Sequence, residues 1–367
     1  MTSLVDCRWL GLGGAGRATE LLLRGLNEVQ PDGDWTLWGP AAVEAYIWPA
    51  AKIRVSEGSP LTLMGQAAAL RIPPHSRALY LHQIRPLANQ HPSVTLIHDI
   101  IPLRYEKRRA VRATKRNYLE AVCARSAGIL TVSDHSAREI ESELGVNPGR
   151  LRIIDYPVDA EAVARIRALR EQEREPNGHL LYVGRVAPHK NVDTLIAAFL
   201  QTTFRAGGGR LVVVCGSRYE AGRVQALGRR YGVADHVDVR WKIGRGDLDL
   251  LFAQAAALVQ PSTAEGFGLP VWEARSCGLP RCVSAIAPLT SLAGSDAVFF
   301  NPRSSTQMAR AIDATVGAEW SAPFTDAPSV SDYATAVIEA FSAFAPATAP
   351  PRRRFKPRRW TSSEAQE

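Results

Sequence analysis

Residues 180–199 read LLYVGRVAPHKNVDTLIAAF, and this stretch contains a strand, a loop and a helix in that order. The apolar run LLYV predicts a buried strand that ends at Gly184, and the apolar positions of VDTLIAAF recur with helical spacing. The loop between them carries two cations, Arg185 and Lys190. A strand followed by a helix is the repeating unit of parallel sheets, whose ligands bind at the carboxyl ends of the strands. The stretch therefore predicts an α/β fold, with two cations placed where a polyanion would bind.

Short apolar runs alternate with longer amphipathic runs along the rest of the chain, which is the pattern of parallel strands joined by helices. In the first half the expected strands are residues 35–38, 78–81, 94–97 and 128–132, and the expected helices are residues 17–29, 108–125 and 135–144. In the second half the expected strands are residues 180–184, 210–214, 237–241, 257–261 and 281–284, and the expected helices are residues 192–204, 219–231, 247–256 and 270–277.

A charged stretch with proline and glycine, ALREQEREPNGH at residues 168–179, separates the two halves. Such a composition is typical of a domain boundary. The sequence therefore predicts two facing Rossmann-like domains, residues 1–170 and 171–328, and a helix over residues 329–345 that packs back on the first domain. The basic tail, residues 346–367, is expected to be disordered.

A second stretch, AEGFGLPVWE at residues 264–273, holds Glu265 and Glu273 on either side of a glycine-rich turn. Pro270 is suited to the start of a helix, so a helix is predicted to begin there with Glu273 in its first turn. The N–H groups at this helix start can bind phosphate oxygens, and they belong to Gly266, Phe267, Gly268 and Leu269. Carboxylates bind vicinal hydroxyls instead. A ligand with a sugar on each side of a diphosphate would fit both the N–H groups and the two carboxylates, and a nucleotide sugar has this form.

The glycine motif GLGGAG at residues 11–16 matches the pattern of a dinucleotide-binding turn. The residues before it argue against that function, because Asp6 and Arg8 stand where a buried parallel strand should be apolar. The next acidic residues also precede the following strand instead of ending it. The turn still leads into a helix whose N–H groups, among them that of Gly14, can receive an anion or the backbone of a second substrate.

The cysteines and the hydropathy bound the class of protein. The five cysteines include no C-x-x-C pair, which is typical of reduced thiols in a cytosolic protein. The first residues do not resemble a signal peptide, and no apolar run is long enough to cross a membrane. We therefore expect a cytoplasmic protein whose membrane contact, at the inner face of the plasma membrane, is at most peripheral.

Basic residues gather in two clusters. Residues 104–116 carry seven basic side chains and one acid, and residues 350–367 carry six basic side chains and two acids. Each cluster is either a solvated surface or a site for an anionic membrane, where each basic residue contributes about 1 kcal/mol. Nucleic acid is not expected as a partner, because no nucleic-acid-binding motif accompanies the charge.

Two segments closely resemble the C-terminal domain of family 4 retaining glycosyltransferases, which have the two-domain GT-B fold. They are YVGRVAPHKNVDTLIAAF at residues 182–199 and PSTAEGFGLPVWEARSCGLP at residues 261–280. Three more segments are similar to the family's glycine loop, its central His-Asp segment and the end of its N-terminal domain. They are DCRWLGLGGAGRATELLLRGL, LIHDIIPL and ILTVSDHSAREI, which begin at residues 6, 96 and 129. Segments similar to HDIIPL are usual in the mannosyltransferase-like branch, which favours GDP-mannose as the donor.

The resemblance implies a set of residues that hold the donor. Arg185 and Lys190 would neutralise its diphosphate, together with the N–H groups of residues 266–269 and that of Gly14. Glu273 would hold the nucleotide ribose. No cofactor is implied, since the nucleotide sugar is a substrate.

The resemblance also implies the residues closest to the reaction. Glu265 would face the transferred sugar, and His98 would come across the cleft to the donor sugar near the reacting carbon. His98 follows an expected strand, which is the right place for a ligand contact, although a histidine followed by an aspartate is also common as a structural pair. The family resemblance favours front-face attack with retention, in which the departing phosphate takes the acceptor proton.

A metal ion is not expected. Asp247 and Asp249 form a D-x-D pattern, which carries a divalent cation in other glycosyltransferases. Here Asp247 precedes an apolar helical pattern, so it is interpreted as a helix N-cap with Asp249 in the first turn. The two cations and the helix N-terminus already supply positive potential for a diphosphate.

The sequence therefore predicts a retaining, metal-independent hexosyltransferase. It would move a hexose, with mannose preferred, from a nucleotide sugar to a saccharide or lipid-linked acceptor in polysaccharide or glycoconjugate biosynthesis. The alternatives are glycosylation of a small soluble secondary metabolite, a GT-B-like phosphorylase or epimerase, and a non-catalytic paralogue that binds nucleotide sugars. The last is disfavoured because the set of Arg185, Lys190, Glu265 and Glu273 is intact.

Overall fold

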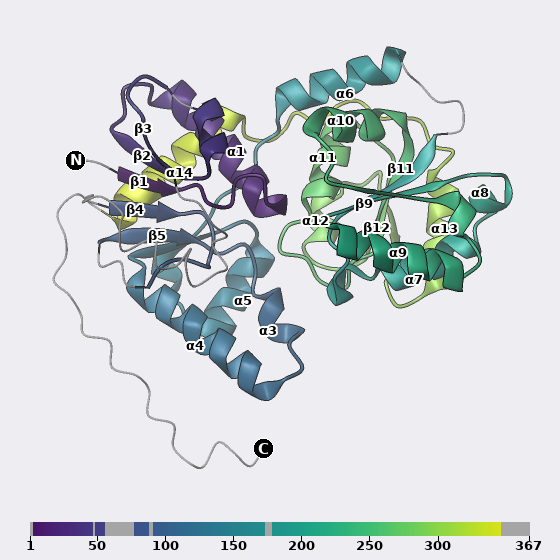
Figure 1. The fold of residues 1–367 in the computed structure, drawn as a ribbon, viewed down its shortest axis with the longest axis horizontal. Coiled ribbons are helices and arrows are strands. Elements are labelled where there is room, and N and C mark those ends of the chain that lie inside the picture. The colour runs from purple at the N-terminus through teal and green to yellow at the C-terminus, as the bar shows by residue number, and fades with distance from the viewer. Residues whose placement is uncertain (1–2, 47, 56–76, 88–90, 173–177, 346–367) are drawn as a thin grey trace.

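The computed structural model describes residues 3–46, 48–55, 77–87, 91–172 and 178–345, and these residues form two parallel β-sheets (Figure 1). The first sheet has the strand order β3 (Lys52–Val55), β2 (Trp35–Gly39), β1 (Ser3–Asp6), β4 (Arg77–Tyr80), β5 (Ser93–Leu96), β6 (Gly128–Thr131) and β7 (Leu151–Ile153). The second has the order β10 (Val237–Trp241), β9 (Leu211–Cys215), β8 (His179–Val183), β11 (Ala255–Gln260), β12 (Arg281–Ser284) and β13 (Val298–Phe300). The predicted fold class, two parallel-sheet α/β domains, is confirmed.

In each sheet, successive strands along the chain first extend the sheet toward one edge and then, after one reversal, toward the other edge. β1 lies between β2 and β4, and β8 lies between β9 and β11. At such a place the connections of the two central strands lead away in opposite directions, and a crevice opens at the carboxyl ends of the strands. We call the ends of β1 and β4 the first switch point, and the ends of β8 and β11 the second switch point.

Strand β1 corrects one conclusion drawn from the sequence. Its residues are buried and pair with β2 and β4, so the charges of Asp6 and Arg8 do not prevent a buried strand. The reason is that the two charges neutralise each other. Arg8 Nη2 lies 2.7 Å from Asp6 Oδ2, and the guanidinium lies 3.9 Å from the centre of the Trp38 ring. The chain therefore does have a buried strand, a glycine turn and a helix in sequence here.

The helices follow the predicted alternation, with differences at their ends. In the first half they are α1 (Gly13–Val29), α3 (Ile101–Arg104), α4 (Arg109–Arg125), α5 (Asp134–Leu144) and α6 (Ala160–Gln172). In the second half they are α7 (Val192–Leu200), α8 (Thr203–Ala206), α9 (Arg218–Arg230), α10 (Arg245–Gln254), α11 (Leu269–Cys277), α12 (Leu289–Leu292), α13 (Ser305–Thr315) and α14 (Val330–Phe344). The single helix predicted over residues 192–204 is two helices, because the Thr202 side chain caps α8 by accepting from Arg205 N. Among the described residues, no helix combines the length and the apolar character needed to cross a membrane.

Helix α14 returns from the second domain and packs against α1 of the first (Figure 1). Glycine permits the close approach, because a Cβ added at Gly25 of α1 would lie 2.5 Å from Val330 O. A Cβ added at Gly128 would likewise meet the Phe344 ring. The chain therefore passes between the domains twice, and the basic tail, residues 346–367, lies outside the described residues.

Candidate active site

The loops at the carboxyl ends of the two sheets meet between the domains. Ser133 Oγ, at the start of α5, donates to Gly266 O at 2.7 Å, and Tyr105 Oη lies 2.6 Å from Thr263 Oγ1. A Cβ added at Gly266 would lie 2.7 Å from His98 O. These contacts join loops of the first domain to the loop after β11, so the predicted site residues of both domains face one cleft.

An ion pair joins the two sides of the second switch point. Lys190 follows β8 and Glu265 follows β11, and Lys190 Nζ donates to Glu265 Oε1 at 2.7 Å and to Oε2 at 2.8 Å. Arg185 also follows β8, but its side chain is 79% exposed and its Nε lies 3.5 Å from Glu220 Oε1. The structure thus brings Lys190 and Glu265 into direct contact and leaves Arg185 accessible to a ligand.

The Glu265 carboxylate is buried and held in one orientation. Its Oε1 also accepts from Gln260 Nε2 and Ser262 Oγ, each at 2.7 Å. Burial alone would raise the pKa of Glu265, but the charge of Lys190 and the bonds from Lys190, Ser262 and Gln260 outweigh it and lower this pKa. Glu265 is therefore an ionised, oriented hydrogen-bond acceptor, which is what binding a sugar hydroxyl requires.

The loop before α11 supplies N–H groups next to this pair. Gly268 caps the helix with φ 108°, a left-handed conformation that glycine adopts without strain. Within the described part of the chain, no acceptor binds the N–H groups of Gly266, Phe267 or Gly268. The start of α1 lies against the same loop, because a Cβ added at Gly14 would lie 3.2 Å from Leu269 Cδ1. The structure therefore brings together the predicted phosphate-binding groups of both glycine turns.

His98 and Asp99 follow β5 and lie opposite the loop before α11. His98 Nε2 lies 3.2 Å from Leu81 O, and burial lowers the pKa of His98 to about 4, so the ring is neutral near pH 7. Burial raises the pKa of Asp99 to about 6; the hydrogen bond from Ile101 N opposes this increase, and the charge of Glu265 adds a smaller one. The backbone of His98 is thus close to the Glu265 loop, and near pH 7 its ring is a neutral hydrogen-bonding group.

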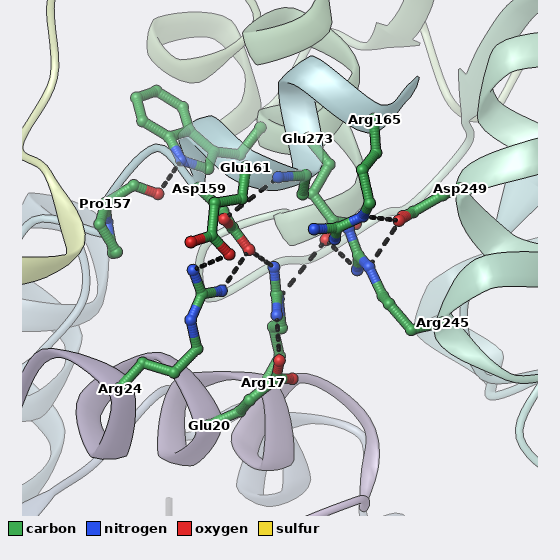
Figure 2. A network of polar contacts seen from close by, with 12 residues as sticks. Arg17, Glu20, Arg24, Pro157, Asp159, Glu161, Arg165, Arg245, Asp249 and Glu273 are labelled. Atoms are coloured by element: carbon green, nitrogen blue, oxygen red, sulfur yellow. Dashed lines mark hydrogen bonds and ion pairs between the residues drawn. The ribbon is translucent and has the colours of Figure 1, made fainter. Parts of the chain in front are cut away.

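Glu273 belongs to a network of charges between the domains (Figure 2). Helix α11 begins at Leu269, so Glu273 lies in its second turn and not in the first, as the position of Pro270 alone predicts. Arg245 Nη1 donates to Glu273 Oε1 at 2.8 Å, and Arg17 Nε lies 3.8 Å from the same oxygen. Glu273, which is predicted to bind the nucleotide ribose, is therefore held between two guanidinium groups, one from each domain.

Arg17 connects three parts of the chain. From α1 it reaches Asp159 Oδ2 at 2.5 Å, Glu20 Oε1 at 2.7 Å and Glu273 of α11 (Figure 2). Burial would raise the pKa of Asp159, but bonds and charges from Arg24 and Arg17 lower it to about 2. Sequence reasoning missed Arg17, although its position three residues after Gly14 in the glycine loop placed it one turn into α1, beside the cleft.

The two aspartates of the D-x-D pattern have roles that differ from the prediction. Gly244 is the N-cap of α10, and Asp247 is its third residue, whose carboxylate accepts from Gly244 N at 3.3 Å. Asp249 is buried in the second turn, where its carboxylate lies 2.8 Å from Arg245 Nε and 3.1 Å from Arg165 Nε. The interpretation of Asp247 as the N-cap is therefore wrong by one turn, and both carboxylates are engaged within the protein.

Comparison with known proteins agrees with this geometry. The family described as Glycosyl transferases group 1 matches residues 166–318, and the family described as Glycosyltransferase Family 4 matches residues 72–162. The O-antigen chain mannosyltransferase RfbU of Salmonella typhimurium is 28% identical over 221 residues, which are 60% of this chain and 59% of that protein. The matched region thus spans little more than half the length of this curated relative.

Two solved structures have the same fold. Sucrose-phosphate synthase from Thermosynechococcus elongatus superposes with a TM-score of 0.68 at 17% identity, over 94% of this chain and 96% of that one. HepE of Anabaena, in complex with UDP and glucose, superposes with a TM-score of 0.63 at 17% identity, over 93% and 95% of the two chains. The resemblance inferred from the motifs is confirmed: one glycosyltransferase family model matches part of the first half of the chain, another matches most of the second half, and the fold is GT-B.

Proposed function

We propose that this glycosyltransferase moves a hexose from a nucleotide-diphosphate sugar to a saccharide or lipid-linked acceptor. The observation that carries the proposal is the second switch point. There Lys190 and the accessible Arg185 follow β8, while the ionised Glu265 and the N-terminus of α11 follow the neighbouring strand β11. Three sources of positive potential suit a diphosphate, and an oriented carboxylate suits the hydroxyls of the sugar attached to it.

Mannose is the proposed hexose and GDP-mannose the proposed donor. The support is the name of the relative RfbU, a mannosyltransferase of O-antigen chains, together with the HDIIPL segment that follows β5. The HepE complex holds UDP and glucose, so the nucleotide and the sugar have to be tested together. Glu273 is proposed to accept from the ribose hydroxyls, with Arg245 and Arg17 holding its carboxylate in place.

Transfer is proposed to proceed with retention at the anomeric carbon. The bond from that carbon to the diphosphate oxygen breaks, a bond to the acceptor oxygen forms on the same face, and the acceptor proton moves to the departing phosphate. Lys190, Arg185 and the helix N-terminus stabilise the negative charge that develops on the leaving group. Glu265 and neutral His98 orient the sugar, and closure of the domains excludes water.

No metal ion is part of the proposal. The two carboxylates that could have carried one, Asp247 and Asp249, are used in the structure to cap α10 and to neutralise Arg245 and Arg165. The positive groups of the second switch point are proposed to take over the neutralisation of the diphosphate.

An anionic membrane is the proposed location of the acceptor. Of the seven basic side chains in residues 104–116, four contact acidic side chains of the first domain, namely Arg104, Arg108, Lys115 and Arg116. Lys107, Arg109 and Arg112 are exposed and form no ion pair within the described residues. These three would lie on a membrane surface close to the His98 segment, which leads into α3 and α4.

Donor hydrolysis tests the function without knowledge of the acceptor. The protein is incubated with GDP-mannose and with a panel of other GDP-, UDP- and dTDP-sugars, and the products are identified by mass spectrometry. We expect slow release of free mannose and GDP, and complete dependence on Lys190. Release of sugar phosphate in the presence of inorganic phosphate would indicate a phosphorylase instead. No turnover of any nucleotide sugar would contradict the proposed function.

A further inference from the structure

The first switch point carries two aromatic side chains to which the proposed reaction assigns no role. Trp9 follows β1 and His82 follows β4, and their rings are stacked with centroids 3.6 Å apart and an angle of 24° between the planes. The stack joins the carboxyl ends of the two strands at which the first sheet reverses direction. Open α/β sheets bind ligands at this place.

Both rings have an N–H group that the described residues leave without an acceptor. Trp9 is only 8% exposed, and its Nε1 has no hydrogen-bond partner there. His82 Nδ1 accepts from Ile84 N at 3.0 Å, so the neutral ring carries its proton on Nε2. Burial, with smaller contributions from His98 and Arg8, lowers the pKa of His82 to about 3, so the ring is neutral near pH 7. The buried Trp9 donor is unfavourable without an acceptor, and a ligand oxygen would satisfy it.

The stack lies next to the reaction site. The His82 and His98 ring centroids are 6.1 Å apart, and the backbone oxygen of His98 contacts the loop at Gly266. His98 Nε2 is bonded to Leu81 O, so the Nδ1 atom of the neutral His98 ring remains an acceptor. The stacked pair and His98 thus bring two donors and one acceptor together near the loop at Gly266.

We infer that the Trp9–His82 stack, with His98 beside it, is the subsite for the saccharide ring of the acceptor. A hexose has an apolar face that packs on aromatic rings, and hydroxyls that both donate and accept hydrogen bonds. The subsite offers both kinds of group from residues that are not part of the second switch point. That the bound saccharide is the acceptor rests on the proposed function, but saccharide binding at Trp9 does not.

The binding itself is tested by nuclear magnetic resonance on the full chain, labelled at the indole nitrogen of its eight tryptophans. The Trp9→Phe variant keeps an aromatic ring and identifies the Trp9 signal by its loss. Trp48→Phe is a matched control, because Trp48 is 2% exposed and its Nε1 also lacks a partner among the described residues, but it lies before the edge strand β3. The probes are methyl α-mannoside, methyl α-glucoside and GDP.

We expect a methyl glycoside to shift the Trp9 signal and leave the Trp48 signal unchanged. The Trp9→Phe and His82→Asn variants should bind the glycoside about tenfold more weakly, since each loses one hydrogen bond and asparagine keeps an acceptor near the Nδ1 position. Their affinity for GDP should stay within about twofold of the parent protein. A protein that unfolds would lose both affinities, so the comparison separates binding from folding.

The outcomes separate this inference from the proposed function. If donor hydrolysis occurs but no glycoside shifts the Trp9 signal, or if GDP alone shifts it, the subsite is wrong and the proposed function stands. If a glycoside shifts the signal but no nucleotide sugar is turned over, the subsite stands and the proposed function is wrong.

Discussion

The two switch points have the same topology and opposite chemistry. At the second, Lys190 forms an ion pair with the buried Glu265, whose Oε1 also accepts from Gln260 and Ser262. At the first, the rings of Trp9 and His82 are stacked. The second switch point therefore carries fixed charges, and the first carries stacked rings with polar edges.

Under the proposed function and the inferred subsite, this difference would let one fold hold two unlike substrates in a single cleft. Parallel sheets supply the crevice whatever the side chains are, and the residues after the strands decide what binds there. Charges suit the diphosphate of a donor, and aromatic rings suit a neutral saccharide. Substitutions at the second switch point should therefore change donor binding, while those at the first should change saccharide binding.

The largest effect is expected for Lys190→Ala. The substitution removes a cation from the proposed diphosphate site and leaves the buried Glu265 carboxylate without its partner. Breaking a buried ion pair in this way lowers the free energy of unfolding by about 3–5 kcal/mol. Affinity for GDP should fall by about ten- to a hundredfold, measured by calorimetric titration, and the melting temperature should fall as well. Arg185→Ala should weaken GDP binding with little change in stability, because Arg185 is largely exposed.

A double variant separates the two effects of Lys190→Ala. Replacing Lys190 by alanine and Glu265 by glutamine together removes both charges, so stability should recover while GDP affinity stays low. Unchanged GDP affinity in both the single and the double variant would show that the second switch point does not bind the diphosphate.

Substitutions of Glu265 and Glu273 should affect different kinetic parameters. Glu265→Gln should lower turnover with a smaller effect on GDP affinity, because its carboxylate is proposed to contact the transferred sugar. Glu273→Gln should weaken GDP binding by about tenfold, the effect of losing one charged hydrogen bond to the ribose. Steady-state kinetics against donor concentration distinguishes them. If both variants lost only affinity, the division of roles would be wrong.

Asp99 should make stability depend on pH. Its pKa in the folded protein is about 6, above the ordinary value of 3.8, so the folded state binds its proton more tightly than the unfolded state. Its contribution to stability is therefore present at low pH and is lost as the pH rises through about 6. Asp99→Asn should be more stable than the parent above this pH, and the difference should shrink toward pH 4 in chemical denaturation. A difference that is the same at all pH values would contradict the raised pKa.

The smallest effect per residue is expected for the exposed basic side chains just before and at the start of α4. Replacing Lys107, Arg109 and Arg112 by alanine should weaken binding to anionic vesicles, by about 1 kcal/mol for each charge. Binding should also fall with added salt in co-sedimentation.

The control for α4 removes the same charge from the second domain. It carries alanine at Arg218, Arg229 and Arg230, which are exposed positions of α9. Equal losses of vesicle binding in both variants would show that binding depends only on the net charge of the protein. A truncation after Pro350 measures how much the tail contributes to vesicle binding; the tail lies outside the described residues.

The second switch point could be predicted from the sequence because its residues lie in two short segments. Arg185 and Lys190 follow one apolar run, and Glu265 and the glycines follow another, so the strand ends alone bring them together. The structure confirms that both segments belong to neighbouring strands, β8 and β11. The geometry of the family motifs is thus largely local.

The first switch point could not be predicted in the same way. The strand before the glycine loop carries Asp6, and only the fold shows that Arg8 neutralises it. The contact of Trp9 with His82 depends on β4 lying next to β1, which follows from a reversal of strand order that no local pattern encodes. The contacts of Glu273 with Arg17 and Arg245 join segments far apart in the chain for the same reason.

The return of α14 to the first domain has a consequence for biosynthesis. Its buried residues, Val330, Tyr333, Val337 and Phe341, belong to the core that α1 and the first sheet share. Domains tend to fold as they leave the ribosome, in the order of synthesis. Here the domain that is made first keeps an uncovered apolar face until the domain made second has been completed. A chain released before residue 330 would expose that face, and a nascent chain should be a client of chaperones until then.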